Sequence, residues 1–228
     1  MSCLSLIFDP SGQLPLGAFC LSIWRTSMNN SQTITHADKG VKGARDDNLK
    51  LPEGALDIGK SRFLLIIDPV ARTSTGTPVD LSALAFMLDD QGVCRSEHDF
   101  LFEGYVACPG LQHMGDDCQY SFAGEEISVD PRAIPAHVQK VVFAVTTESR
   151  HSPGHSMESL HCLHLSLLKG RSDSRPVAAY GACEMGAATV IQVAVLIRNS
   201  EGWVLDCSLR GFQNGLADVC RGFGLDAQ

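Results

Sequence analysis

The segment "ATVIQVAVLIRNSEGWVLDCSL", residues 188–209, indicates the fold class most directly. Its two apolar runs, 188–197 and 203–209, have the length and the β-branched content of strands. Between them, "RNSEG" (198–202) carries turn residues, and Gly202 is available for a positive φ angle. The segment therefore predicts a β-hairpin.

The same pattern, a short apolar run followed by turn residues, recurs along the chain from Leu49. One run ends in a group with turn chemistry at residues 89–92. We find no βαβ unit and no internal repeat, so the pattern favours an all-β sandwich over an α/β fold. The expected strands are 62–68, 81–92 including its closing turn, 99–106, 140–146, 160–168, 176–184, 188–197 and 203–209.

One segment near the C-terminus predicts a short helix. In "NGLADVCRGFGL" the apolar residues recur at helical spacing, Asn214 is a suitable N-cap and Gly224 is a suitable stop. The apolar positions are Leu216, Val219, Cys220 and Phe223. A single helical turn is also expected within "DPRAIPAHVQ" (130–139), between its prolines.

Composition and charge narrow the functional classes. The chain has 228 residues, with 18 Lys and Arg against 26 Asp and Glu, for a net charge of −8. Because binding to phosphates needs a basic face, this balance argues against nucleic acid as a partner. Nine cysteines without a CxxC pair are typical of reduced thiols, so we expect a cytoplasmic protein.

The N-terminal part differs from the rest of the chain. Its apolar patches are interrupted by Asp9, Pro10 and Pro15, and no run is long enough for a membrane span. A polar stretch follows from Met28. We therefore expect a flexible extension over residues 1–48, a single domain over 49–228 and no membrane span.

Catalytic motifs are missing from the sequence. There is no GxGxxG after a strand, no Walker loop and no GxSxG. Nucleotide-dependent and hydrolytic activities therefore lack support, and we expect a protein that is not an enzyme.

The stretch "HMGDDCQYSFAGEE", residues 113–126, interrupts this apolar chain with four carboxylates. Such a cluster is either a metal-binding loop or a solvated rim of the domain. Composition alone does not choose between the two.

Several stretches, taken in order, resemble the TerD family, the tellurium-resistance or stress-protein domain. They span about Leu49 to Leu225. Four of them are "VDLSALAFML" (79–88), "HMGDD" (113–117), "EEISVDPRAIPAHVQKVVFAVT" (125–146) and "GFQNGLADVCRGFGL" (211–225). The fifth is the group Ser96, Asp99, Phe100 and Phe102. The resemblance implies a β-sandwich of two antiparallel sheets with a short C-terminal helix, Ca²⁺ held in acidic loops at one end, and no established enzymatic activity.

Carried over residue by residue, the resemblance implies a reduced calcium site. Asp80 keeps the first position of the family's D-L-D pair, but Ser82 replaces the second aspartate. The expected ligands are Asp80, Gly115, Asp116, Asp117 and Glu125, with Ser82, Glu103 and Glu126 as additional candidates. Calcium takes six to eight oxygens, so this set is sufficient for one weakened site. Loss of calcium binding is the open alternative.

Two further groups of side chains raise other possibilities. Cys162 and the histidines 151, 155, 161 and 164 resemble a soft-metal cluster, although alternation along a strand would point His161 and His164 to opposite faces and place Cys162 with His164. Cys108 precedes the acidic stretch, Cys118 lies within it, and the two are the candidates for a thiol-based reductase. Ordinary loop histidines and reduced cysteines are the simpler interpretations.

The function expected from the resemblance is binding. We expect a calcium-tuned interaction scaffold that meets other proteins of a stress-response or tellurium-resistance system. The alternative is a diverged TerD-like interaction module that no longer binds calcium.

Overall fold

The computed structural model describes residues 55–71, 81–102, 107–114, 124–147, 157, 160–169 and 174–226. The proposed domain boundary at residue 49 lies outside these ranges and stays a prediction. No helix of the described ranges has both the length and the apolar character needed to cross a bilayer.

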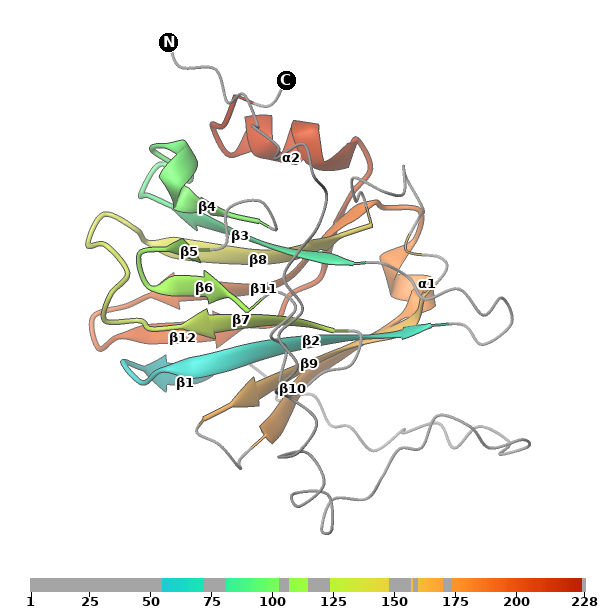
Figure 1. Ribbon diagram of the computed structural model, residues 1–228, viewed down its shortest axis with the longest axis horizontal. Coiled ribbons are helices and arrows are strands. Elements are labelled where there is room, and N and C mark those ends of the chain that lie inside the picture. The colour runs from blue at the N-terminus through green and yellow to red at the C-terminus, as the bar shows by residue number, and fades with distance from the viewer. Residues whose placement is uncertain are drawn as a thin grey trace, which may run out of the picture. The chain divides into compact units, whose positions relative to one another are not determined.

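The described chain forms two antiparallel sheets, which confirms the predicted fold class (Figure 1). In the first sheet the strand order is β1 (Leu56–Gly59), β12 (Trp203–Asp206), β11 (Val190–Arg198), β8 (Lys140–Thr146), β3 (Ser82–Leu88) and β4 (Phe100–Leu101), and β13 (Arg210–Phe212) also pairs with β11. In the second sheet the order is β10 (Ser174–Gly181), β9 (Leu160–Leu168), β2 (Phe63–Ala71), β7 (Glu125–Val129), β6 (Leu111–His113) and β5 (Ala107–Cys108).

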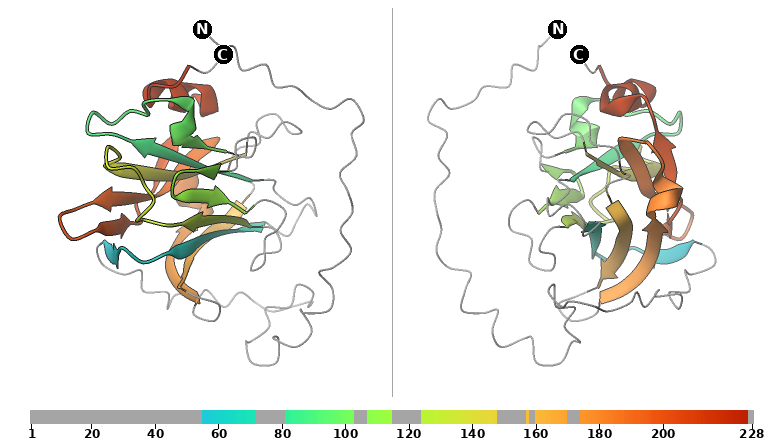
Figure 2. Two further views of the ribbon diagram at one scale, coloured as in Figure 1. Left: turned by 60° about the vertical axis from the view of Figure 1, so that its left-hand side comes forward. Right: turned by 90° about the vertical axis from the view of Figure 1, so that its right-hand side faces the viewer.

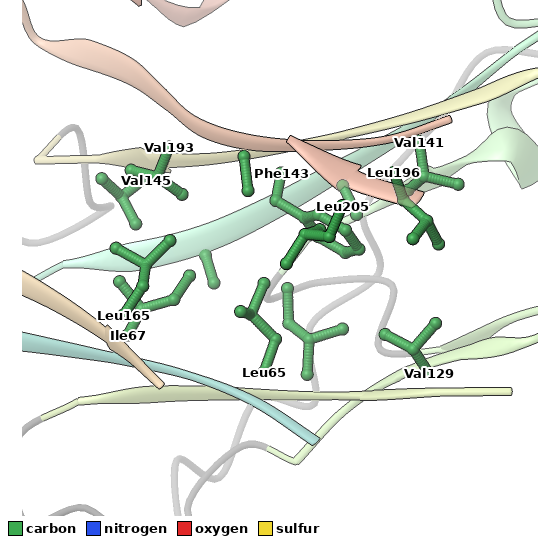
Figure 3. Packing of buried hydrophobic residues seen from close by; sticks show 14 of the residues in the cluster. Leu65, Ile67, Val129, Val141, Phe143, Val145, Leu165, Val193, Leu196 and Leu205 are labelled. Atoms are coloured by element: carbon green, nitrogen blue, oxygen red, sulfur yellow. The ribbon is translucent and has the colours of Figure 1, made fainter. Parts of the chain in front are cut away.

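The core lies between the sheets and is made by the inward residues of each strand. Leu65 and Ile67 of β2 face Phe143 and Val145 of β8 across this layer, and all four are fully buried (Figure 3). Alternation along a strand sends every second side chain inward, so apolar runs as short as "KVVFAVT" are sufficient to build it. A sandwich core of this kind fixes the register of its strands, because a slip by one residue would expose the apolar set.

A smaller apolar cluster covers the outer face of the first sheet. Helix α2 (Gly215–Gly222) packs Val219 and Cys220 there, next to Leu84 and Phe86 of β3. Phe223 follows the helix, and its ring centroid lies 4.9 Å from that of Phe86. The predicted terminal helix is therefore confirmed, and Gly224 follows it at a φ of +80°.

Several predicted elements differ in their limits. The expected strand 176–184 ends at Gly181, where the short helix α1 (Ala182–Met185) begins, and the Glu184 carboxylate accepts a hydrogen bond from the Gly181 N–H at 2.8 Å. The expected strand 99–106 is reduced to β4, because Asp99 belongs to a 3₁₀ turn, η1 (Glu97–Asp99). Residues 103–106 lie outside the described ranges.

The expected helical turn within 130–139 is wrong. This segment instead makes two separate turns, in which Ala133 N–H donates to the Asp130 carbonyl and Val138 N–H donates to the Pro135 carbonyl. Pro135 has no N–H to continue a helical ladder, which separates the turns.

The two ends of the sandwich differ in which connections they carry. At one end β2, β6, β8 and β10 finish and β3, β7, β9 and β11 begin, as the pairings of Ser82 with Thr146 and of Ile67 with Glu125 show. We call this the loop end; it lies on the right in Figure 1. The opposite end, which carries the β11–β12 hairpin on the left of Figure 1, is the hairpin end.

Candidate functional site

The predicted calcium ligands divide into two groups. Asp80, Glu103, Gly115, Asp116 and Asp117 lie outside the described residues. Ser82, Glu125 and Glu126 are described, and all three sit at the loop end, at the starts of β3 and β7.

The described residues next to Asp80 and Gly115 both lie at the loop end. Leu81 directly follows Asp80 in the chain and leads into β3, while His113 ends β6 shortly before Gly115. The two sides of the acidic stretch are joined where Met114 N–H donates to the Glu126 carbonyl at 2.9 Å. Antiparallel topology thus brings segments far apart in the sequence to one end of the sandwich.

Glu125 is the described acid that is best placed as a ligand. Its carboxylate Oε2 lies 2.6 Å from His113 Nε2, and the two side chains are 19% and 5% exposed. His113 shares the inward face of β6 with Leu111, and Glu125 shares the inward face of β7 with Ile127. The pair therefore lies between the sheets, where the core meets the loop end, and one carboxylate is held on a rigid strand.

Ser82 and Glu126 face other directions. Ser82 shares the outer face of β3 with Leu84 and Phe86, which belong to the cluster under α2. Glu126 alternates with Glu125 and Ile127, so its side chain points to the outer face of the second sheet, where it is 1% exposed. The three described candidates thus project to three different sides of the sheets.

Sequence reasoning did not single out His113 as a site residue. Its position at the head of the quoted acidic stretch was visible, but the signal for pairing with Glu125 is weak. Twelve positions separate the two residues in the chain. Only the pairing of β6 with β7, in which His113 lies opposite Ile127, brings them together.

The described side chains do not by themselves complete a metal centre. Across the described ranges, no group of three His, Cys, Asp or Glu residues is placed to hold an ion. A calcium ion needs six to eight oxygens, so Glu125 could supply only part of a coordination shell. The predicted site therefore rests on residues of the neighbouring acidic segments and stays a prediction.

The Cys108 thiol is poorly suited to act as a nucleophile. Cys108 lies in β5 and is 8% exposed, and burial, with the nearby Asp99 carboxylate, raises the pKa of its thiol to about 12. Because the thiolate is the reactive form, Cys108 is not a reactive cysteine at neutral pH. Cys108 thus fits the simpler interpretation of an ordinary reduced cysteine, and Cys118 lies outside the described residues.

The histidine and cysteine group is only partly described, since residues 151 and 155 lie outside the described ranges. The opposite-face prediction for His161 and His164 is wrong. A register irregularity between Val70 and Ala71 of β2 interrupts the alternation of β9, so both histidines are exposed. The shared face of Cys162 and His164 is confirmed, because Cys162 Sγ lies 3.3 Å from His164 Nε2.

Comparison with known proteins identifies the family. The family described as "TerD domain" matches residues 41–223. The chain is 27% identical to the tellurium resistance protein TerD of Serratia marcescens over 162 residues, covering 69% of this chain and 84% of that protein. It is 24% identical over 154 residues to general stress protein 16U of Bacillus subtilis, covering 66% and 80% of the two chains.

A solved structure supports the same fold. The crystal structure of a homologue of telluride resistance protein from Streptomyces coelicolor superposes with a TM-score of 0.55 at 15% identity. The superposition covers 74% of this chain and all of that one. At this level of identity the likeness shows the fold alone. The match of the family model over residues 41–223 shows that this chain belongs to the TerD family.

Proposed function

We propose that this chain is a non-enzymatic TerD-family stress protein whose loop end binds one Ca²⁺ ion. The bound ion orders the loop end as a surface for other proteins of a stress-response or tellurium-resistance system. The names of the relatives, tellurium resistance protein and general stress protein, support the physiological setting. The acidic balance of the chain favours cations over nucleic acid as ligands.

One observation carries the proposal, namely the placement of Glu125. Glu125 lies on β7, and its carboxylate is held between the sheets at the loop end. His113 Nε2 lies 2.6 Å from this carboxylate. Asp80 immediately precedes the described segment that enters β3, and Asp116 and Asp117 follow β6 by a few residues. Chain connectivity alone therefore keeps further carboxylates within a few residues of this end.

Calcium titration tests the proposal. The chelator-treated full chain is titrated with Ca²⁺ by calorimetry, and its thermal unfolding is followed in parallel. A ligand that binds only the folded state stabilises it, by about 2.7 kcal/mol when free Ca²⁺ is 100 times the Kd. We expect heat uptake or release and a rise in Tm for the unaltered chain.

A matched pair of variants assigns the site. Glu125→Gln removes one charged ligand and should weaken calcium binding. Glu201→Gln makes the same change in an exposed turn at the hairpin end and should leave binding intact. The ion site is refuted if the unaltered chain shows no heat and no Tm shift at millimolar Ca²⁺. Equal binding by both variants would place the site away from Glu125.

The directions in which the Ser82 and Glu126 side chains point favour a second function. Ser82 and Glu126 point to outer faces of different sheets, away from Glu125. That arrangement suits a diverged interaction module that uses the same end of the sandwich without an ion. In that case partner binding would be unaffected by chelator, whereas the calcium-dependent scaffold would lose its partner when calcium is removed.

A further inference from the structure

The outer face of the second sheet places a thiol and an imidazole side by side. Cys162 and His164 lie two residues apart on β9, and Cys162 Sγ is 3.3 Å from His164 Nε2. His164 is exposed and Cys162 is half-buried. Both groups are therefore directed away from the core and reachable from solvent.

The strands on either side hold this pair in place and leave it uncovered from one direction. β9 lies between β2 and β10, so its backbone is hydrogen-bonded on both edges. On β10 the residues opposite Cys162 and His164 are Gly181 and Ala179, which carry no side chain long enough to cover them. On β2 the residue opposite His164 is Asp68.

The spacing of the two atoms fits a shared metal ion. Tetrahedral zinc lies about 2.3 Å from sulfur and about 2.0–2.1 Å from imidazole nitrogen, which places the two ligand atoms about 3.5 Å apart. The observed separation of 3.3 Å is close to this value, so binding requires little movement of either side chain. We propose that Cys162 and His164 chelate a thiophilic divalent cation such as Zn²⁺ on the outer face of β9.

The coordination chemistry defines the state of each ligand. The ion binds the Cys162 sulfur as a thiolate, and the proton of the thiol passes to solvent. His164 binds as neutral imidazole through Nε2 and keeps its proton on Nδ1. Since no third His, Cys, Asp or Glu of the described chain joins the pair in a metal-binding group, water completes the shell.

The ion-free pair is not an activated nucleophile. Burial raises the pKa of the Cys162 thiol, which disfavours its thiolate form. A thiol in this state reacts slowly, whereas a metal ion can still displace its proton. The 3.3 Å separation of Cys162 Sγ and His164 Nε2, rather than thiol reactivity, is therefore what supports a role for this pair.

Cobalt titration tests this site independently of calcium. Co²⁺ takes the place of Zn²⁺ and gives a near-ultraviolet charge-transfer band only when a thiolate is bound. The full chain, reduced with a phosphine and freed of metal, is titrated with Co²⁺ and then with Zn²⁺ as competitor. We expect the band to appear with Co²⁺, to disappear with Zn²⁺, and to be unaffected by Ca²⁺, which prefers oxygen ligands.

Four variants decide which residues bind. Loss of even an outer-shell partner typically weakens a metal site about 10- to 100-fold. Because His164 is proposed as a direct ligand, His164→Ala should lower the affinity for Co²⁺ at least 10-fold. Cys162→Ser should abolish the charge-transfer band. The controls are Cys207→Ser, a second half-buried thiol, and His161→Ala, an exposed histidine on the same strand. Both controls should bind Co²⁺ within a factor of two of the unaltered chain.

The outcomes that would overturn the site are equally definite. Absence of the band at millimolar Co²⁺ in the unaltered chain, or its persistence in Cys162→Ser, rejects the site. Weakening by His161→Ala as large as that by His164→Ala rejects the two-residue assignment. Thermal unfolding of each variant verifies that it is folded, and the calcium titration of Cys162→Ser separates a failure here from a failure of the loop-end site.

Discussion

The hairpin end and the loop end of the sandwich close the same two sheets by different means. At the hairpin end backbone hydrogen bonds hold the connections: Asn199 N–H donates to the Gly202 carbonyl, and Asp130 N–H donates to the Gly110 carbonyl. At the loop end the connections include residues 72–81, 114–124, 147–159 and 182–189, and the first two carry predicted calcium ligands. Figure 2 shows these two ends from two further directions.

Because the two ends are built differently, we expect substitutions at each end to affect a different property of the protein. Tight turns leave little room for substitution, because the backbone of one turn fills the space beside the next. Surface connections away from such contacts can vary in sequence while the strands that they join stay the same. We therefore expect substitutions at the hairpin end to change the free energy of unfolding, and substitutions at the loop end to change ligand binding.

The largest expected effect is at Gly110 of the hairpin end. Its φ is +87°, and a Cβ atom there would lie 2.7 Å from the backbone nitrogen of Ile134. Gly110→Ala should cost about 3 kcal/mol, because a left-handed backbone costs about 1–2 kcal/mol and overpacking about 1–3 kcal/mol. Urea unfolding followed by circular dichroism measures the loss.

Gly92 provides the matched control for Gly110. Its φ is +81°, but a Cβ atom there would meet nothing within 4 Å. Gly92→Ala should therefore cost only the backbone term, about 1 kcal/mol. Equal losses in the two variants would show that the close approach to Ile134 is not what makes this end rigid.

The next largest effect is expected at Arg198, which closes the hairpin end over residues 130–139. Its guanidinium donates to the carbonyls of Ile134, Pro135 and Val138 and lies 4.2 Å from the ring centroid of Trp203. Arg198→Met leaves these carbonyls with fewer donors and should cost about 2 kcal/mol. Thermal unfolding in the absence of metal measures it.

Arg210 is the control for Arg198. Its guanidinium lies over the Phe212 ring at 5.1 Å, and the residue is exposed. Arg210→Met should change stability by less than about 1 kcal/mol, since exposed cation–π contacts contribute little. A loss from Arg198→Met no larger than this would contradict the role given to its three carbonyl partners.

A smaller effect on stability is expected at the loop end. In chelator-treated protein, Glu125→Gln should cost less than about 1 kcal/mol, because the amide oxygen can still accept a hydrogen bond from His113. Urea unfolding without metal measures this. A loss comparable to that of Gly110→Ala would mean that the Glu125–His113 pair holds the fold together and would weaken the contrast between the ends.

The smallest effect concerns the acid range. A hydrogen bond from Arg62, together with the backbone N–H of Arg132, holds the pKa of Asp130 below its usual value. A carboxyl whose pKa is lower in the folded state contributes stability above its unfolded pKa and loses it as pH falls through the folded pKa. Asp130→Asn should therefore flatten the fall in stability below about pH 4.

That flattening is measured as the midpoint of urea unfolding at several acidic pH values. Because Arg62 is largely exposed, its ion pair with Asp130 is screened by solvent and the effect is expected to be small. If the variant and the unaltered chain show parallel pH profiles, Asp130 does not contribute to the pH dependence of stability.

Strand by strand, the sequence was informative where the periodicity was long and local. The runs at 140–146 and 160–168 form strands β8 and β9 with those limits, because each is a largely apolar run bounded by polar residues. Short strands such as β5 and β13 were not predicted, since two or three residues contain too little periodicity to detect. Their existence depends on a neighbouring strand that supplies the hydrogen bonds.

The candidate site was less accessible to sequence reasoning than the fold. The resemblance includes Glu125 among the predicted ligands, and in the structure this residue begins β7 at the loop end. It gave no indication that His113 would lie 2.6 Å from the Glu125 carboxylate, or that Ser82 would face the cluster under α2. Those facts depend on which strands pair and on which alternate residues of each strand face the core.

The sequence by itself determined the hairpin at 198–202, the terminal helix and the acidic character of the loop end, because each is encoded by residues within one turn or one short run. Only the tertiary structure decided which acidic side chain faces inward and which thiol meets an imidazole. Alternation along β9 predicts opposite faces for His161 and His164, but a register irregularity against β2 reverses that parity. Such irregularities are set by pairing with another strand, so a single run of sequence does not contain them.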